Sequence, residues 1–176
     1  YFFDIFNTDG FLGDMPLVNF AYAPFFEVLP RKYRFRILNA CMSRFFKLGL
    51  FDARGRAVPF QMIANDGNLL VNPLTLTALD QQGIAERYDI VVDFTRFRVG
   101  DRLKVVNLLR MRDDGRGPRE ELSYAEAIKR NAEDPVLGAM LEFRIVGSVP
   151  SVDVEGVTHY SSSPDVSRVP PTMTEQ

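Results

Sequence analysis

Cys41 and Met42 stand side by side between two strand-like segments, residues 33–38 and 45–50. A thiolate and a weak thioether, together with two imidazoles, form the ligand set of copper sites that transfer electrons. The chain has a single histidine, His159, which lies far beyond Cys41 in the sequence. It therefore cannot build such a site alone. We expect Cys41 to be a small, semi-buried apolar residue and His159 to be an exposed side chain of a linker.

Other patterns that support chemistry are missing from the sequence. Cys-x-x-Cys, His-x-His and His-Glu-x-x-His are absent, which removes the usual zinc sites. A serine or cysteine nucleophile needs a base beside it, and a Gly-x-Ser-x-Gly turn is also absent. No glycine-rich loop of the kind that holds phosphate is present.

Paired carboxylates could still serve glycoside hydrolysis, and four acidic residues are candidates by type alone. Those residues are Asp66, Glu86, Asp89 and Asp93. Asp66 precedes Gly67 in an Asn-Asp-Gly-Asn sequence, which favours a turn held by the aspartate's own hydrogen bonds. The other three alternate with apolar residues near strand ends. We therefore expect structural roles for all four.

Composition bounds the protein to one soluble domain with tails. The 176 residues are 46% hydrophobic, which is enough for a substantial core. The net charge of −2, from 21 basic and 23 acidic residues, gives no field that would attract nucleic acid or an anionic membrane. No apolar run approaches the roughly 18 residues of a membrane-spanning helix. The chain has no signal-peptide pattern, and we expect it to be a piece of a longer polypeptide.

Alternating apolar and polar residues predict a series of short strands. In residues 33–38, Tyr33, Phe35 and Ile37 share one face while Arg34 and Arg36 point to the other. The same period predicts strands at residues 45–50, 58–64, 74–79, 87–94, 102–109 and 139–146, separated by turn signals. Because no helix-length amphipathic segment separates the early strands, the sequence predicts an all-β sandwich.

Residues 113–135 depart from the strand pattern. They begin as a glycine- and charge-rich loop, and Ser123 followed by Glu126 has the pattern of a helix capping box. We expect a mobile loop and then a short helix with Leu122, Ala125 and Ile128 on its apolar side. The domain organisation is predicted as a sandwich over residues 1–147, with this insertion, and a linker or tail over 148–176.

The order of several motifs is more specific than any one of them. The sequence contains YRFRILNA followed by Arg44, then FQMIANDGN, then ERYDIVVDF. This order, over about residues 11–109 with a weaker similarity at 133–146, resembles the middle domain of three-domain multicopper oxidases. The bacterial laccase, bilirubin oxidase and phenoxazinone synthase branch is the most similar. The sequence departs from that family's pattern at Phe20, which replaces a turn glycine, and at Cys41, where serine is common.

The resemblance implies a cupredoxin-like Greek-key sandwich that holds no copper. In these oxidases the type 1 copper and the trinuclear cluster are bound by the first and third domains. The missing histidines are thus what a middle domain would show. We expect no catalytic or metal-binding residue in this chain. Structural roles are expected at the motif positions, which are Asn39, Arg44, Asp66, Gly67, Glu86, Arg87 and Asp93.

Two functions follow from the sequence. The first is a scaffold between flanking first and third cupredoxin domains of one polypeptide, whose oxidase would be periplasmic, secreted or spore-associated. In it, the insertion residues Arg116, Arg119 and Tyr124 would border the substrate mouth. The second is a free-standing β-sandwich interaction module. Exposed apolar patches, with possible homo-oligomers through them, would favour the first. The phenylalanines expected to contribute are Phe2, Phe3, Phe6, Phe11, Phe25 and Phe26.

Overall fold

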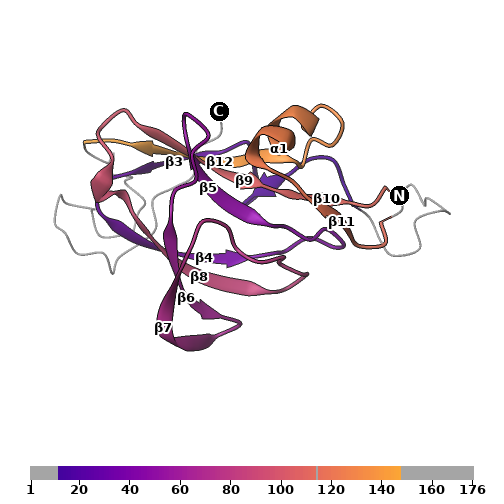
Figure 1. The fold of residues 1–176 in the computed structure, drawn as a ribbon, viewed down its shortest axis with the longest axis horizontal. Coiled ribbons are helices and arrows are strands. Elements are labelled where there is room, and N and C mark those ends of the chain that lie inside the picture. The colour runs from indigo at the N-terminus through magenta and orange to yellow at the C-terminus, as the bar shows by residue number, and fades with distance from the viewer. Residues whose placement is uncertain (1–11, 114, 148–176) are drawn as a thin grey trace, which may run out of the picture.

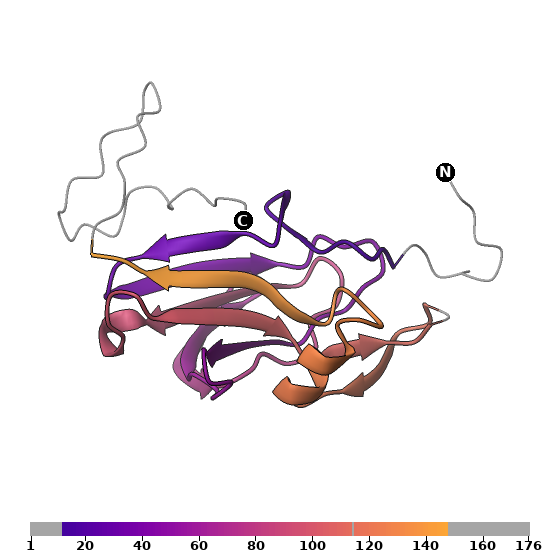
Figure 2. The same ribbon diagram turned by 90° about the horizontal axis from the view of Figure 1, so that it is seen from above.

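Two four-stranded sheets face each other in the protein, in a computed structural model that describes residues 12–113 and 115–147 (Figures 1 and 2). The first sheet has the order β3-β12-β9-β5, formed by Phe25–Val28, Gly138–Ile145, Arg102–Asn107 and Leu48–Asp52. The second has the order β4-β8-β6-β7, formed by Lys32–Leu38, Arg87–Asp93, Phe60–Asn65 and Asn68–Leu76. The predicted all-β sandwich is confirmed.

Smaller elements surround this sandwich. A short hairpin, β1 (Leu17–Val18) with β2 (Ala21–Tyr22), precedes the first sheet. A second hairpin, β10 (Leu109–Met111) with β11 (Pro118–Glu121), leads into the helix α1 (Tyr124–Arg130), and both lie at one end of the sandwich (Figure 1). A single 3-10 turn, η1 (Phe94–Arg96), follows β8.

The chain repeatedly crosses from one sheet to the other. It passes from β4 to β5, from β5 to β6 and from β8 to β9, and each step changes sheet. Within the two sheets only β3 and β12 pair in parallel, and every other pair is antiparallel. Such crossing connections between antiparallel sheets make a Greek-key sandwich.

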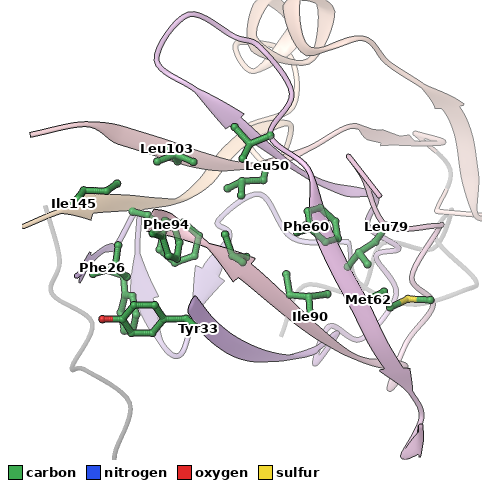
Figure 3. Packing of buried hydrophobic residues seen from close by; sticks show 14 residues of the cluster. Phe26, Tyr33, Leu50, Phe60, Met62, Leu79, Ile90, Phe94, Leu103 and Ile145 are labelled. Carbon is green, nitrogen blue, oxygen red and sulfur yellow. The ribbon is translucent and has the colours of Figure 1, made fainter. Parts of the chain in front are cut away.

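Aromatic residues fill the centre between the sheets (Figure 3). Phe94 is completely buried, and its ring contacts Tyr33, Phe35 and Phe143 edge-on at centroid distances of 5.7, 6.3 and 5.2 Å. The alternation in β4 places Tyr33 in this core and leaves Arg34 and Arg36 outside. Burial of one such aromatic side chain stabilises the fold by about 1.5–3 kcal/mol.

Five of the predicted strands match β4, β6, β8, β9 and β12, while two predictions are shifted. The strand expected at 45–50 begins at Leu48, because Phe46 forms only an isolated bridge with Gln82. The strand expected at 74–79 is the end of the longer β7, which begins directly after the Asp66-Gly67 turn. Its first half has no alternation, since an edge strand exposed on both faces does not need one.

The prediction for the insertion is partly wrong. Pro118–Glu121 is a strand, where a loop was expected, because it pairs with Leu109–Met111. The capping box is confirmed: Ser123 accepts from the Glu126 amide, and the Glu126 carboxylate accepts from the Ser123 amide. The buried helix residue is Ala127, while Ala125 and Ile128 are exposed. Tyr124 sets this rotation because its ring packs on Phe51, with centroids 4.7 Å apart.

Of the phenylalanines near the N-terminus that were expected to form an exposed patch, Phe25 and Phe26 lie among the described residues. Phe26 is buried in the core, and Phe25 lies under Arg144, whose guanidinium is 3.6 Å from the ring centroid. The expectation for these two residues is therefore wrong. Phe2, Phe3, Phe6 and Phe11, the predicted tail over 148–176 and His159 lie outside the described residues.

Candidate functional site

Cys41 lies in apolar surroundings. It packs against a buried cluster formed by Phe46, Val136 and Met140. Burial raises its pKa above the ordinary thiol value, and the positive charge of Arg44 opposes this only in part. The thiol is therefore neutral at pH 7 in the metal-free chain.

The described residues around Cys41 do not offer another set of metal ligands. Met42, the neighbour of Cys41, has an exposed fraction of 76%. Within residues 12–113 and 115–147, no three His, Cys, Asp or Glu side chains gather closely enough to hold a metal ion. The described residues thus do not fit the type 1 copper ligand set, which needs two imidazoles beside the thiolate.

Three of the motif residues, Asn39, Arg44 and Glu86, belong to a buried polar network at one end of the sandwich. Asn39 is 2% exposed, and its amide donates to the carbonyl oxygens of Arg44 and Gln82 at 2.7 and 3.1 Å. Its side-chain oxygen accepts from the Cys41 amide at 3.0 Å. The asparagine therefore closes the connection from β4 toward β5 and joins it to the segment before β8.

Arg44 is the strongest single link in this network. Its guanidinium forms a paired contact with Asp134, Nη1 to Oδ2 at 2.9 Å and Nη2 to Oδ1 at 3.0 Å. The same group donates to the carbonyl oxygens of Leu12 and Gly13. The side chain is only 8% exposed. One residue thereby joins the incoming chain, the β4–β5 connection and the segment before β12.

Glu86 and Gln82 complete the other side of the network. The Glu86 carboxylate accepts from the Gly83 amide at 2.7 Å, which closes the turn before β8. The Glu86 carbonyl accepts from the Asn39 amide and from the Gln82 side chain. The Glu86 carboxylate therefore holds the backbone of its own turn in place.

Asp66, Gly67 and Arg87 lie together at the β6–β7 hairpin, away from the buried network. The Asp66 carboxylate accepts from the Arg87 amide at 2.9 Å, and the Arg87 side chain lies 3.5 Å from the same oxygen. Gly67 has φ of +84°, and Asp66 itself has φ of +45°. A two-residue turn with both φ values positive is the usual hairpin geometry, which explains the Asp-Gly sequence.

Asp93 caps the η1 turn. Its carboxylate accepts from the Thr95 hydroxyl at 2.6 Å and from the Thr95 amide at 3.0 Å. These two bonds lower the carboxyl pKa. Asp93 also lines a surface hollow of about 470 Å³ with Asp52 and Arg56, which are bound to each other.

Acid–base chemistry finds no support in that hollow or at the other candidate carboxylates. A general acid needs a raised pKa, and both Asp52 and Asp93 have lowered ones. Asp89 is bound by Arg34 and lies near Arg36. These acidic residues act as hydrogen-bond acceptors and ion-pair partners.

Sequence reasoning missed two residues of the buried network, Asn107 and Asp134. The Asn107 amide is 1% exposed, accepts from the amides of Lys47 and Leu109, and donates to the carbonyls of Leu109 and Val136. All of its hydrogen-bonding groups are used, at the point where β9 ends and β10 leaves the sheet. An asparagine at the end of an apolar strand was the only signal available.

The three insertion residues do not form one site. Arg119 on β11 lies 3.3 Å from Asp113, beside a shallow hollow in the β10–β11 turn, and Arg116 lies within that turn. Tyr124 packs on Phe51 and covers Gly55. The tyrosine therefore anchors α1, while the two arginines lie on the surface of the hairpin.

None of the helices in the part of the chain that the structure describes is long and apolar enough to cross a membrane.

Known proteins with related sequences are multicopper oxidases and their relatives. The chain is 42% identical over 106 residues to bilirubin oxidase of Albifimbria verrucaria, covering 58% of this chain and 18% of that protein. It is 44% identical over 87 residues to a Bacillus subtilis laccase, covering 49% and 16%. Cell division protein FtsP of Dickeya dadantii is 37% identical over 92 residues, covering 51% and 18%. No family model matches the chain.

Solved structures extend the similarity to most of the fold. The multicopper oxidase McoA of Aquifex aeolicus superposes with a TM-score of 0.62 and 26% identity, covering 89% of this chain and 33% of that one. The sandwich is therefore cupredoxin-like. The chain spans about a fifth or less of the length of the curated relatives named here.

Proposed function

We propose that this chain, a relative of the multicopper oxidases with their cupredoxin-like sandwich, is the copper-free middle domain of such an enzyme. The observation that carries the proposal is the combination of that relationship with a single histidine in the whole sequence. One imidazole cannot supply a type 1 site, which needs two, and a trinuclear cluster needs still more.

The role we assign to the domain is to hold its two neighbours in register. A scaffold needs fixed attachment points, and the network of Asn39, Arg44 and Asn107 supports this role. Arg44 clamps the incoming chain through the Leu12 and Gly13 carbonyls, and Asp134 precedes the final strand β12. The segment at Leu12 and Gly13 and the segment before the last strand are thereby tied to one buried ion pair.

The activity of the whole enzyme is part of the same proposal. The first and third domains would bind the copper ions, take single electrons from a phenol, a pigment or a metal ion, and reduce dioxygen to water. This chain would supply no catalytic residue. The arginines of the β10–β11 turn, Arg116 and Arg119, would lie at the edge of the substrate mouth.

The first test is the intact mass of the protein as it is expressed from its gene, together with copper analysis of the same sample. A larger mass, copper bound to it and His-x-His sequences on both sides of this segment would support the proposal. A 20.0 kDa product from the start would contradict it. Stoichiometric copper in that small product would also show that the chain binds copper by itself, against the proposal.

The alternative is a free-standing β-sandwich interaction module without catalytic activity. A relative that is named a cell division protein favours a role outside oxidase chemistry, although the match covers only 18% of that longer protein. A module of that kind would be monomeric in isolation, would bind no copper and would keep its fold without neighbours. The mass measurement separates the two candidates, because the module does not need oxidase domains on the same polypeptide.

A further inference from the structure

The β1–β2 hairpin exposes an aromatic side chain in a strained position. Its two turn residues, Asn19 and Phe20, have φ of 49° and 68°. Asparagine tolerates this left-handed conformation, but a bulky side chain such as phenylalanine rarely adopts it. Phe20 is also 94% exposed, so no contact within the described chain compensates for the strain. Glycine would be the ordinary residue at this position of a two-residue hairpin turn.

The rest of the hairpin has one face that packs and one that does not. Val18 and Ala21 form a cross-strand pair, and Ala21 is buried while Val18 packs against the buried cluster that contains Phe46 and Met140. The other pair, Leu17 and Tyr22, is 49% and 53% exposed. Together with Phe20 and the 64% exposed Met15, this pair forms an apolar surface that we name the hairpin knob.

The position of the knob on the chain points to what covers it. Arg44 holds the carbonyls of Leu12 and Gly13, only a few residues before Met15, so the place where the chain reaches the sandwich is fixed next to the knob. A folded domain that precedes Leu12 on the same polypeptide is therefore tethered beside it. Such a tether gives an effective concentration in the millimolar range for short linkers.

The size of the knob also favours a tethered partner over a second copy of the chain. Four partly exposed side chains offer a few hundred Å² at most, whereas stable complexes of separate proteins bury roughly 800 Å² on each partner. A small contact suffices when the two surfaces are already joined.

We propose that the hairpin knob docks into an apolar recess of the domain that precedes it on the same polypeptide, with Phe20 as the anchor. This rests on the proposed function, which supplies the preceding domain. The strain at Phe20 places the phenyl ring at the tip of the turn, where it reaches furthest from the sandwich. The recess that receives it is lined by apolar side chains and excludes water.

The test compares Phe20→Gly in two contexts: the 176-residue chain and the complete polypeptide encoded by the gene. In the short chain the substitution relieves strain and removes an exposed ring, so the melting midpoint rises by about 2 °C. In the complete polypeptide it removes the anchor. The midpoint of this domain then falls, and proteolysis between the domains becomes severalfold faster.

Two further variants separate the anchor from backbone effects. Phe20→Asn also accepts the left-handed conformation but lacks glycine's flexibility, and we expect it to behave as Phe20→Gly does. Val71→Ser is the matched control, since Val71 is 97% exposed on the edge strand β7, away from the hairpin. It should have the same effect in both contexts.

Three results would overturn the inference. If Phe20→Gly raises the midpoint equally in both contexts, the knob has no partner in the polypeptide. If the short chain forms dimers in sedimentation that Phe20→Gly abolishes, the occupant is a second copy. If the gene encodes nothing before this segment, the proposed function fails first, and the intact mass shows this before any variant is made.

Discussion

At the scale of single residues, Arg44 is the side chain whose loss should matter most. Replacing it with alanine removes the cation paired with the Asp134 carboxylate, which keeps the hydrogen bond from the Val136 amide. It also removes the donor to the carbonyls of Leu12 and Gly13. Removing one partner of a buried ion pair costs about 3–5 kcal/mol. We therefore expect Arg44→Ala to lower the free energy of unfolding by about that amount, measured by urea denaturation.

The control for that variant is an arginine that is ion-paired but exposed. Arg34 pairs with Asp89 on the outer face of β4, where its side chain is 47% exposed. Surface pairs of this kind contribute about 0–1 kcal/mol. An Arg34→Ala variant should therefore unfold close to the wild-type midpoint. If both variants lose the same free energy of unfolding, the buried network contributes no more to stability than the surface ion pair does.

At the scale of elements, the helix α1 depends on its N-terminal cap. Ser123→Ala removes the acceptor of the Glu126 amide and one of the donors that hold the Glu126 carboxylate. Loss of a serine cap costs about 1 kcal/mol. We expect a decrease of that size in the unfolding free energy. Hydrogen exchange should be faster in α1 and unchanged in β4; uniform acceleration would contradict a local role.

The β10–β11 turn is the part of the insertion that can be changed without damage to the core. Deleting residues 113–135 would remove Leu122 and Ala127, which are buried in a cluster with Val106 and Leu137. The double change of Arg116 and Arg119 to serine leaves that cluster intact. If the proposed oxidase is the parent of this chain, we expect the double change to alter the ratio of kcat/KM between phenolic substrates severalfold and to leave dioxygen reduction unchanged. Unchanged ratios on several substrates would exclude the turn from the substrate mouth.

Long strands with one buried face could be predicted from the sequence, and short or fully exposed ones could not. Alternation located β4 and β8 because each has a core side and a solvent side. It missed β1, β2, β3, β10 and β11, which are too short to show a period, and the first half of β7, which is exposed on both faces. The rotation of α1 was wrong because Tyr124 packs on Phe51, a contact distant in sequence.

At the scale of the molecule, the sequence predicted some residues of the polar network but not the distant residues to which they bind. Asn39, Arg44 and Glu86 stood out through their motifs, and each makes the backbone contacts reported above. Asp134 and Asn107 did not, because their partners come from three separate segments. Which distant carboxylate meets a buried arginine depends on the crossing of the chain between sheets, and local spacing does not contain that information.

The pH dependence of stability is a property of the whole fold, because several carboxylates shift in the same direction. The pKa of Asp93 is lowered by its bonds with Thr95, and that of Glu121 by hydrogen bonds from Lys47 and Gln81. For Asp52, burial raises the pKa, but the bonds from Arg56 and Arg54 outweigh it. A lowered native pKa means that the unfolded state binds protons first as the pH falls.

The stabilisation from these carboxylates is therefore complete above about pH 5 and is lost as the pH falls through about 4 and below. We expect the melting midpoint of the chain to be constant between about pH 5 and pH 7 and to decrease steadily at lower pH. Asp93→Asn removes one contributor and should make the acid decrease shallower. An acid profile that is identical for Asp93→Asn and the wild type would show that the Thr95 contacts do not persist in solution.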